Sequence, residues 1–496
     1  MKDNGTAYSK GQDTDKKRLL RVTAGNVRHS HVYINGHYDF FPPNCLGGSK
    51  QSADSPTIDI QLDGLGRTIR TDIGCDAKTG KPRGFLRARS WVRQFFECHD
   101  VKPGAMLALE RLSERSYRLS VEHFKQPGFL VCAEFFAGIG LVRLALERQG
   151  WQVIFANDID PKKAEMYRAN WPQDDHLHVG DIHALHADDL PTCELFTASF
   201  PCNDLSIAGR WEGLQGKESS SFWGLVRLLR EMGDRRPPLV MLENVVGFLM
   251  SHGGKDLEKA LLALNELGYA VDAIILNAAR WVPQSRPRLF VLAGRAEGQE
   301  KRLCALVSDA RPELLTDFIN GHPNIRWNIR DVAPLPPAAA HLTDIIEDLP
   351  NDDPRWWNEK RTEYFMSQMS EKHAEQARKM ITGRSYSYAT AFRRVRNGKS
   401  MAELRTDGIA GCLRTPRGGS GRQILLKAGH GKYKVRLLTA RECARLQGVP
   451  DSYVINVPQN QALFGFGDAV CVPAIEWIVE YYLAPVACEL AAKALI

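Results

Sequence analysis

The chain of 496 residues is 44% hydrophobic and 25% charged, the composition of a soluble globular protein with two or three domains. No apolar run approaches the length of a membrane-spanning helix, and the polar N-terminus lacks the apolar stretch of a signal peptide, so we expect a cytoplasmic protein. The 11 cysteines are scattered and none stands at C-x-x-C spacing, which argues against a disulfide framework and against a metal site.

The net charge of +7 is unevenly distributed along the chain. Residues 1–128 hold 21 basic against 14 acidic side chains, and residues 384–436 hold 13 basic against two acidic ones. Two basic regions suggest a polyanion that is contacted at two places, and nucleic acid is the usual one. A pair of solvated surfaces fits the same counts, so charge alone does not decide between them.

The predicted elements change character at residue 128. We expect a mobile polar tail over residues 1–17 and a β-rich domain over residues 18–127, with one amphipathic helix at residues 90–99. From residue 128 to residue 300, apolar runs alternate with helical patterns, which predicts an open, mainly parallel α/β sheet.

The expected strands of this sheet are residues 129–136, 152–156, 195–200, 239–242 and 289–293, and the expected helices are residues 141–149, 161–170, 222–232 and 256–267. Residues 301–435 show no clear element order and are expected to form an irregular lobe. Helical periodicity returns within residues 436–496, which we expect to rejoin the first sheet.

A short glycine turn, residues 136–140 (Phe-Ala-Gly-Ile-Gly), follows the first strand and opens a helix. Glycines there let the backbone approach a ligand closely, and the helix N-terminus offers free N–H groups. Asp158 ends the next strand, where a carboxylate can accept hydrogen bonds from a ribose diol, and Asp181 could hold an adenine amino group. The turn lacks the final glycine of a pyrophosphate-binding loop, so an adenosine ligand without phosphates fits it better.

Cys202 follows Pro201 at the end of the strand at residues 195–200, where open α/β sheets bind their ligands. A lone cysteine can be a nucleophile there, although it is more often a buried small hydrophobe. Glu243 ends the strand at residues 239–242, and a carboxyl beside apolar walls can stay protonated near neutrality and act as an acid. A surface carboxylate that caps the next helix is the alternative.

Two arginines, Arg286 and Arg288, stand at alternate positions just before the strand at residues 289–293. Such a pair would point to one side and could brace a carboxylate or a phosphate, or it could be an ordinary surface pair. Each of these signals is modest alone, but all of them fall at strand ends and in a fixed order.

The order resembles that of the cytosine-C5 DNA methyltransferases of bacterial modification systems and their eukaryotic relatives. The resemblance covers residues 130–295 and 436–496 and implies a Rossmann-like class I S-adenosylmethionine-dependent methyltransferase sheet. It implies that S-adenosylmethionine is bound by Phe136, Ala137, Gly138, Gly140, Asp158, Ile159, Asp181, Ile182 and Pro201. Catalytic roles follow for Cys202, Glu243, Arg286 and Arg288, and residues 436–453 resemble the motif that braces the target-recognition lobe.

The mechanism that the resemblance implies is chemically coherent. Carbon 5 of cytosine is too weak a nucleophile to take a methyl group directly, but addition of the Cys202 thiolate to carbon 6 gives an enamine. Glu243 would neutralise the charge at ring nitrogen 3, while Arg286 and Arg288 position the base and the nearby carboxylate. The cytosine must be flipped out of the duplex for this to happen.

Two positions depart from the family pattern. Asn203 stands where the family usually has Gln, and Asp468 stands where the more usual residue is Asn. The acid at residue 468 puts a cofactor contact at that position in doubt.

The lobe over residues 301–435 then has an evident task in target recognition. Its arginines and glutamine can read guanine and adenine edges in the major groove, or can contact phosphates alone, and its glycines allow the backbone to approach the DNA closely. The candidates are Arg393, Arg394, Arg396, Arg414, Arg417, Arg422 and Gln423.

The N-terminal domain more loosely resembles the B3-like pseudobarrel DNA-binding domains. The match runs from residue 80 to residue 104. The charges that would face the DNA are Lys78, Lys81, Arg83, Arg87 and Arg89. A protein-interaction domain or a purely structural domain fits this region as well.

We expect a monomer that acts on double-stranded DNA, with a cognate restriction or phage-defence system as a further partner. Within the enzyme class, a tRNA cytosine-C5 methyltransferase is the alternative, because one relative with the same motifs acts on RNA. Outside that class, a catalytically silent DNA-binding regulator would carry the same basic regions.

Overall fold

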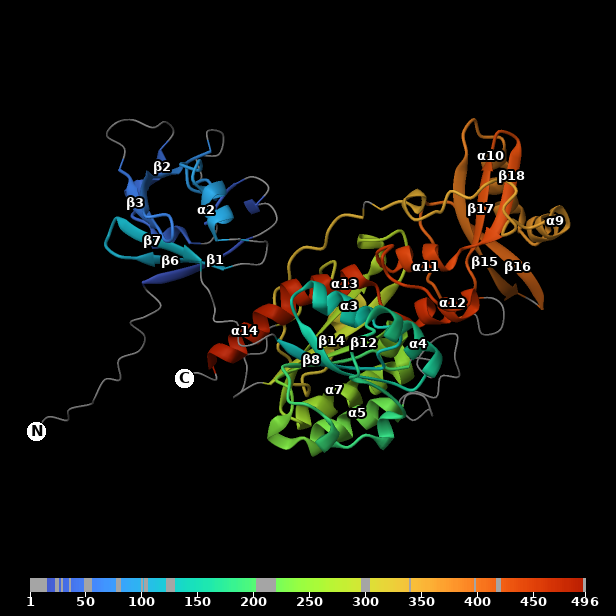
Figure 1. Cartoon of the computed structure of the whole chain (residues 1–496), viewed down its shortest axis with the longest axis horizontal. Coiled ribbons are helices and arrows are strands. Elements are labelled where there is room, and N and C mark those ends of the chain that lie inside the picture. The colour runs from blue at the N-terminus through green and yellow to red at the C-terminus, as the bar shows by residue number, and fades with distance from the viewer. Residues whose placement is uncertain are drawn as a thin grey trace, which may run out of the picture. The chain divides into compact units, whose positions relative to one another are not determined.

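The computed structural model of the chain divides into two compact units, Met1–Gly128 and Phe129–Ile496 (Figure 1). The tail predicted over residues 1–17 lies outside the described residues up to residue 15, and Lys17 already begins a strand. The structure describes residues 16–22, 26–27, 30–34, 37–48, 56–76, 82–99, 101, 106–121, 130–201, 220–295, 304–338, 340–396, 398–415 and 421–493.

The first unit is a small β-rich domain built around one helix. Its described residues form a five-stranded sheet in the order β1-β6-β7-β3-β4 and a separate pair of β2 and β5. Helix α2 (Val92–Cys98) packs Phe95 against the same core as Trp91 and Tyr117. The strands are β1 (Lys17–Arg21), β2 (Leu46–Gly48), β3 (Ile58–Leu62), β4 (Arg67–Thr71), β5 (Ile73–Gly74), β6 (Met106–Arg111) and β7 (Ser116–Val121).

The second unit is organised by a seven-stranded sheet of described residues in the order β10-β9-β8-β11-β12-β14-β13. Neighbouring strands are parallel except that β14 runs antiparallel to both β12 and β13. The strands are β8 (Val131–Phe135), β9 (Gln152–Asp158), β10 (Leu177–Val179), β11 (Leu195–Ala198), β12 (Leu239–Val245), β13 (Tyr269–Asn277) and β14 (Pro287–Arg295). The order reverses between β8 and β11, and open α/β sheets bind ligands at such a switch point. The predicted Rossmann-like α/β class is confirmed.

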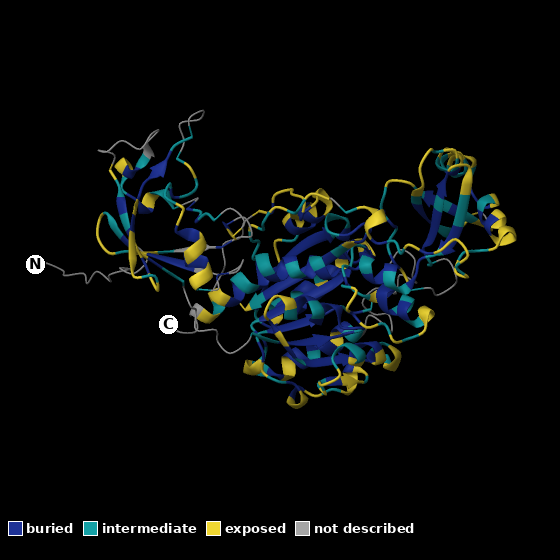
Figure 2. Cartoon of the chain, turned by 45° about the horizontal axis from the view of Figure 1, so that its top comes forward, coloured by how far each residue is buried: buried dark blue, intermediate teal, exposed yellow. Residues whose placement is uncertain are grey.

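Helices cover both faces of this sheet, so its central strands are largely buried and drawn dark blue in Figure 2. Cys132 of β8 faces one apolar core, whereas its neighbours Ala133 and Phe135 face the other. The first core contains residues of α3 (Leu141–Arg148), α4 (Pro161–Asn170), α13 (Val472–Ile478) and α14 (Ala484–Lys493). The second contains residues of α5 (Ser220–Glu231), α6 (Gly247–Met250), α7 (Lys255–Glu266) and α8 (Glu313–Gly321).

Residues 304–330 belong to this sheet region, although the sequence pattern places them in the lobe. The N–H of Val271 in β13 donates to Arg326 O at 3.0 Å, and Asn328 N–H donates to Val271 O at 2.8 Å. Trp327 and Phe318 are buried in the same core as α7. The boundary expected at residue 301 therefore falls too early.

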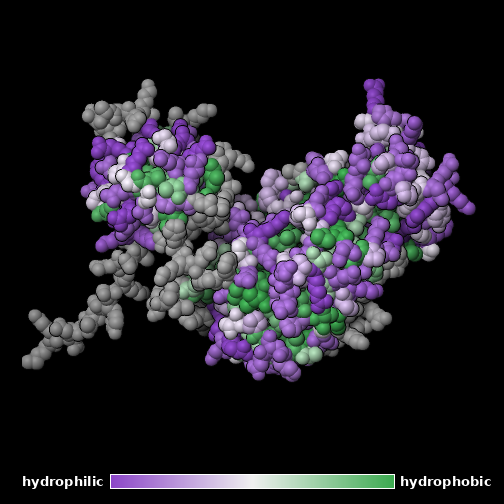
Figure 3. All heavy atoms as spheres, in the orientation of Figure 1, coloured by the Kyte–Doolittle hydropathy of each residue, from purple (hydrophilic) through white to green (hydrophobic). Residues whose placement is uncertain are grey.

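The lobe itself is a four-stranded antiparallel sheet of described residues in the order β16-β15-β17-β18, covered by α9 (Glu359–Ser367) and α10 (Glu371–Ile381). The strands are β15 (Ser387–Arg396), β16 (Lys399–Arg405), β17 (Ile424–Gly429) and β18 (Lys432–Leu437). The lobe is more regular than its sequence suggests, because small residues such as Ala389, Ala391 and Ala402 supply much of its core. In Figure 3 the lobe presents mostly hydrophilic side chains.

The C-terminal helices return to the seven-stranded sheet. Helix α11 (Ala440–Leu446) precedes α12 (Gln459–Asp468), and α13 packs with α3 in one core. By length and composition the stretch Gln459–Ala491 could cross a membrane, contrary to the expectation from sequence, but 67% of its most apolar window is buried inside the protein. Its apolar character is accounted for by core packing.

Candidate active site

The glycine turn after β8 adopts a backbone conformation that favours glycine. Gly138 and Gly140 have φ angles of 57° and 82°. A Cβ at Gly140 would lie 2.5 Å from Trp171 Cζ3, so that side is closed. At Gly138 the nearest atom would be Phe136 O at 3.9 Å, so this face of the turn is open. The turn therefore presents accessible backbone at the start of α3.

Phe136 and Ala137 complete the turn. Phe136 has a positive φ of 57°, which is uncommon for a residue with a side chain. The Ala137 N–H donates to Asn157 O at 3.0 Å and ties the turn to β9. The backbone of the whole turn is thus fixed before any ligand binds.

Asp158, at the end of β9, reaches back to this turn and accepts a hydrogen bond from Gly138 N–H at 2.7 Å. Burial raises the pKa of its carboxyl, and the nearby charge of Lys163 offsets this only in part. Ile159 beside it leaves 65% of its surface exposed. Asp181 caps a short turn by accepting from the N–H two residues on, and Ile182 is buried behind it. A carboxylate next to open apolar surface fits the ribose and adenine of a nucleoside ligand.

The strand end expected to carry the nucleophile is tied to its neighbour. Asn244 of β12 donates from Nδ2 to Phe200 O at 3.2 Å, and half-buried Pro201 follows. Cys202 lies outside the described residues, as do the residues up to 219. Asn244 was missed as a positioning residue, although it directly follows Glu243.

Glu243 and Arg288 form an ion pair at the adjacent strand end. Arg288 Nε lies 3.0 Å from Glu243 Oε1, and their side chains are 16% and 8% exposed. The antiparallel register of β12 and β14 places Val245 opposite Arg288, so the arginine folds back towards the carboxylate. Glu243, Arg286 and Arg288 line a small pocket with Phe290 and other apolar residues.

Arg286 has contacts that differ from those predicted. It is 2% exposed and donates to the carbonyl oxygens of Leu413, Gly467 and Ala469 at 2.9, 3.1 and 2.6 Å. Burial, aided by the charge of Arg288, lowers its pKa. Its guanidinium is therefore engaged with main-chain groups, and Arg286 also lines the pocket that contains Glu243 and Arg288.

Cys412 is a residue of this site that the sequence did not indicate. Its Sγ lies 3.4 Å from Arg286 Nη1 and 3.9 Å from Arg288 Nη2. Burial disfavours its thiolate, but the charges of Arg286 and Arg288 outweigh burial and lower the pKa of the thiol. No motif marks Cys412, because both arginines lie far from it along the chain.

The segment that resembles a lobe brace makes buried contacts across the unit. Arg436 and Glu442 form a two-pronged ion pair with both oxygens at 2.6 Å, and both side chains are fully buried. Gln284 accepts from Leu413 N–H at 2.9 Å and donates to the end of α11. The Tyr453 hydroxyl donates to Ile139 O in the glycine turn. One segment therefore contacts both the lobe and the glycine turn.

Asp468 lies beside the same turn. Its Oδ2 forms an ion pair with Lys163 Nζ at 2.7 Å, and the lysine's Cδ is 4.0 Å from where a Cβ of Gly138 would lie. Lys163, on α4, was not predicted as a site residue. Its neighbour Lys162 is exposed, and nothing in the sequence separates the two.

The basic residues of the lobe fall into two groups. Arg394, Arg396 and Arg414 are exposed, and Arg396 pairs with Glu403 at 2.6 Å. Arg393 is half-buried and donates to Gln368 Oε1 at 2.9 Å. Arg417 lies outside the described residues.

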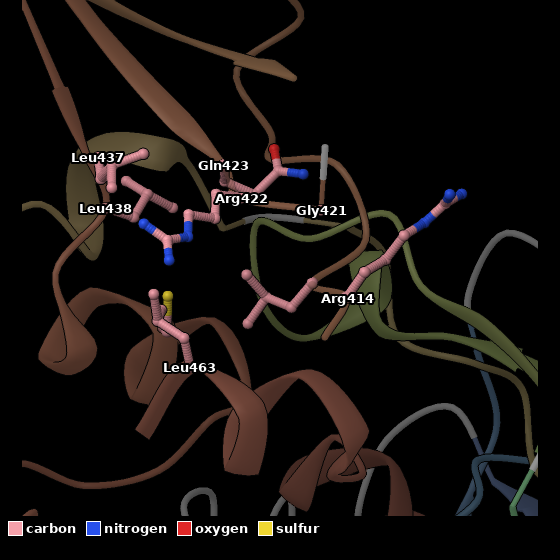
Figure 4. Close-up of a pocket in the computed structure, with 9 residues that line it drawn as sticks. Arg414, Gly421, Arg422, Gln423, Leu437, Leu438 and Leu463 are labelled. Atoms are coloured by element: carbon pink, nitrogen blue, oxygen red, sulfur yellow. The ribbon is translucent and has the colours of Figure 1, made fainter. Parts of the chain in front are cut away.

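Two predicted base-reading residues are directed inward. Arg422 points into a pocket lined by Leu438 and Leu463, and its Nη2 donates to Asn460 Oδ1 at 2.9 Å (Figure 4). Gln423 is 7% exposed and donates to Cys412 O at 3.4 Å. The sequence could not separate these residues from Arg414, which points away from the pocket in Figure 4.

In the N-terminal unit, Arg83 and Arg89 are exposed and Arg87 is half-buried. Arg87 pairs with Asp72 at 2.6 Å, and Arg89 lies over the Phe85 ring at 5.1 Å. The predicted positions Lys78 and Lys81 lie outside the described residues.

Comparison with known proteins identifies the second unit. A model of the C-5 cytosine-specific DNA methylase family matches residues 130–483. The Type II methyltransferase M.DsaV of Dactylococcopsis salina is 30% identical over 353 residues, which cover 71% of this chain and 85% of that protein. The Type II methyltransferase M.HhaI of Haemophilus parahaemolyticus is 28% identical over 71% of this chain and 94% of its own length.

Among solved structures, the S. pombe Dnmt2 methyltransferase aligns with a TM-score of 0.49 at 20% identity, over 72% of this chain and 99% of that one. The family match covers the glycine turn, the strand ends and the brace, and leaves the N-terminal unit outside it. The chain belongs to the C-5 cytosine-specific DNA methylase family, and it is a DNA cytosine-C5 methyltransferase that uses S-adenosylmethionine as the methyl donor.

Proposed function

We propose that Cys202, Glu243 and Arg288 carry the methyl transfer to a flipped-out cytosine within a specific DNA sequence. The Cys202 thiolate forms a bond to carbon 6, and the ring electrons shift to make carbon 5 nucleophilic. Glu243 shares a proton with ring nitrogen 3 and neutralises the charge there, and Arg288 holds the Glu243 carboxyl. S-adenosylmethionine, when bound, supplies the electrophilic methyl group. A base then removes the carbon-5 proton, and the thiolate leaves as the double bond reforms.

The ion pair of Glu243 and Arg288, one strand away from the switch point, is the observation that carries this proposal. It joins two residues 45 positions apart at the end of β12, at an N–O distance of 3.0 Å. The hydrogen bond from Asn244 to Phe200 O ties that strand end to the one from which Pro201 leads to Cys202. Adjacent parallel strand ends lie at one edge of the sheet, which supports a shared site for the three groups.

The experiment is bisulfite sequencing of DNA from a methylation-free bacterial host that expresses the chain. We expect protected cytosines in one short recurring sequence for the wild type and for Cys304→Ala, a control at an exposed cysteine. Cys202→Ala should give no protection but should still bind DNA, because the thiol contributes chemistry and little affinity. Protection by Cys202→Ala would contradict the mechanism, and transfer to tRNA alone would favour the RNA enzyme.

We propose that the glycine turn and the β9 and β10 ends hold S-adenosylmethionine. Gly138 offers open backbone, and Asp158 provides a carboxylate for the ribose hydroxyls. The exposed face of Ile159 and the acid at Asp181 suit the adenine ring and its amino group. Pro201, at the end of β11, would line the path towards the base.

For DNA recognition we propose the exposed arginines of the lobe, above all Arg394 and Arg414. Replacing Arg394 by Ala should weaken DNA binding severalfold and reduce its salt dependence. Arg378→Ala is the matched control, because Arg378 is also an exposed lobe arginine and is paired with Glu371. Equal effects of both substitutions on binding would point to a diffuse charge effect without a specific contact.

We propose that the N-terminal unit is a second DNA-binding module that contacts DNA near Arg83 and Arg89. On the five-stranded sheet, acid and base alternate across strands, since Glu110 stands opposite both Lys17 and Arg118. This balance makes the sheet a poor polyanion surface and favours the segment at residues 82–89. We further propose that the protein is a cytoplasmic monomer that works beside a cognate restriction or defence system. Light scattering and sequencing of its genomic neighbourhood test these two points.

A further inference from the structure

Asp468 is held in place from two sides. On one side, Arg286 donates from a single nitrogen, Nη2, to Gly467 O and Ala469 O at 3.1 and 2.6 Å, which fixes the backbone before and after the acid. On the other side, Lys163 Nζ pairs with the carboxylate at 2.7 Å. Buried Arg286 therefore fixes the backbone on either side of Asp468, and half-buried Lys163 fixes the direction of its side chain.

The pair differs from an ordinary surface ion pair. The Lys163 side chain is 19% exposed, although it carries a full charge, and Asp468 is the last residue of α12. A carboxylate at the negative end of a helix is unfavourable without a cation beside it. Burial lowers the pKa of Lys163, but the charges of Asp468 and Asp158 outweigh burial and raise it. The lysine thus stays charged between two carboxylates.

Both residues border the glycine turn. The Lys163 side chain passes 4.0 Å from the Cβ position of Gly138. Helix α12 packs on the turn so closely that a Cβ at Gly465 would lie 2.8 Å from Ile139 Cγ2. The open face of Gly138 is therefore framed by one positive and one negative group.

Sheet order indicates which part of the cofactor lies there. The proposed ribose and adenine contacts are at the ends of β9 and β10, and the proposed reacting groups are at the ends of β11 and β12. Because β8 lies between these pairs, the sulfonium, which is bonded directly to the ribose 5′ carbon, and the methionine chain attached to it lie over the turn after β8. The free amino-acid end of the methionine part is a zwitterion, with one ammonium and one carboxylate.

We propose that Lys163 and Asp468 bind the methionine end of S-adenosylmethionine as a complementary ion pair, with Lys163 facing its carboxylate and Asp468 facing its ammonium. The inference rests on the proposed cofactor site. It explains why an acid is accommodated at residue 468, since the lysine on α4 neutralises it and adds a contact of its own. The two residues are positioning and binding groups, and neither takes part in the chemical step.

The test compares two ligands by calorimetry on the full chain. S-Adenosylmethionine has the amino-acid end, whereas 5′-methylthioadenosine keeps the adenosine and sulfur but lacks that end. We expect Lys163→Met to weaken S-adenosylmethionine binding about tenfold or more, since hydrogen bonds to charged groups are the stronger ones, and to leave 5′-methylthioadenosine binding unchanged. Lys162→Met is the matched control on the same helix and should change neither affinity.

Equal weakening of both ligands by Lys163→Met would overturn the inference, because it would show that the pair only joins α4 to α12. An unchanged affinity for S-adenosylmethionine would overturn it as well. A wild-type chain that binds 5′-methylthioadenosine and S-adenosylmethionine equally would contradict the amino-acid contacts while leaving the adenosine site intact. Failure of the wild type to bind either ligand would instead contradict the proposed cofactor site itself.

A charge exchange separates binding from structure. In the double variant Lys163→Glu with Asp468→Lys, the ion pair between the two helices is restored with the opposite direction. We expect its thermal midpoint to return towards that of the wild type while S-adenosylmethionine binding stays weak, because each charge then faces a like charge on the ligand. Recovery of the wild-type affinity in this variant would overturn the inference.

Discussion

Arg286 and Arg288 are separated by one residue but have different main partners. Arg288 holds the Glu243 carboxylate, whereas Arg286 donates to carbonyl oxygens of two other segments. Buried carbonyl groups that lose their donor cost free energy on folding. Arg286 therefore stabilises the backbone around the site, and Arg288 contacts the carboxyl group that we propose faces the base.

This difference predicts that the same conservative change affects stability at one residue and the rate of methyl transfer at the other. Arg286→Lys should lower the free energy of unfolding by about 2–4 kcal/mol, because an ammonium cannot bridge the carbonyl groups that a planar guanidinium reaches. Arg288→Lys keeps a charge near Glu243 and should lower the rate of methyl transfer about tenfold with little loss of stability. Urea unfolding and single-turnover transfer measure the two quantities, and equal loss of stability in both variants would contradict the distinction.

Glu134 is a buried acid in the middle of β8, close to the glycine turn. One of its oxygens has no hydrogen-bond partner among the described residues. Burial raises the pKa of its carboxyl from 4.5 to about 8, and the charge of Arg143 lowers it only in part. The folded protein therefore keeps this proton at pH values where the unfolded chain has released it.

Linkage gives the sign of the effect on stability. Below pH 4.5 both states hold the proton, and between that value and about 8 only the folded state does, so stability falls as the pH rises through this window. Glu134→Gln has no proton to lose. We expect the free energy of unfolding of the variant, relative to that of the wild type, to rise between pH 5 and pH 8 by on the order of a few kcal/mol. Urea titrations at several pH values measure this. If the free energies of unfolding of the wild type and the variant changed in parallel with pH, the raised pKa of Glu134 would be contradicted.

For single residues, the sequence predicts which residue types gather at the site but does not predict their hydrogen-bond and ion-pair partners. The alternation of Arg286 and Arg288 predicts that both point to one side, and both do reach Cys412 Sγ. Their other partners come from segments far along the chain, which local spacing cannot reveal. Lys163 could not be separated from Lys162 for the same reason.

Among the elements, β13 was missing from the predicted sheet. All but the last of its residues are buried, so its sequence does not alternate, and Asp272 interrupts the apolar run. The Asp272 carboxylate is fully buried and accepts from Arg311 Nη2 at 2.7 Å and from Arg330 N–H at 3.1 Å. The last strand in the order of the seven-stranded sheet is thus stabilised by an ion pair with a residue beyond β14.

Removing one partner of this pair leaves an uncompensated buried charge. We expect Arg311→Met to lower the free energy of unfolding by about 3–5 kcal/mol. The control is Lys379→Met, which removes an exposed ion pair with Glu375 on α10 and should leave stability unchanged. Calorimetry on both variants measures the free energy of unfolding. A loss of less than this for Arg311→Met would contradict the prediction and show that the site repacks or admits water.

Strands followed by a helix with clear start signals were predicted well. The helix expected at residues 161–170 has the observed bounds Pro161–Asn170. Proline at its first turn and the Asp160 cap mark that start in the sequence. The lobe strands were not predicted, because alanines and arginines alternate there and give little apolar signal. Element prediction therefore failed where packing is made by small residues or by a buried ion pair.

Because the chain forms two compact units, we expect the second unit to fold without the first when the chain is divided after Gly128. A chain that begins at residue 129 should bind S-adenosylmethionine with unchanged affinity, since the glycine turn and its partners all lie in the second unit. Its DNA affinity should fall, and the affinity should depend less steeply on salt, because fewer phosphates are neutralised. Calorimetry and fluorescence anisotropy at several salt concentrations test this. Loss of cofactor binding would show that the division is misplaced.

For the whole molecule, the order of the motifs predicts the family and the fold of the second unit. The motifs are recognisable because the switch point of an α/β sheet requires particular residues at strand ends. The N-terminal unit has no such requirement, and its β-rich class follows only from alternation and turns. Its role therefore stays a proposal.

The hydrogen bond from Tyr453 to Ile139 has a consequence for how the enzyme is made. The glycine turn is synthesised early, but its partner and the helices α13 and α14 that cover the α3 side of the sheet come from the last part of the chain. A nascent polypeptide that has emerged only as far as the lobe carries an uncovered apolar face, which is a binding surface for chaperones. The cofactor site closes only after Tyr453 and helices α13 and α14 have been synthesised, so we expect chains that terminate before them to be inactive and prone to aggregate.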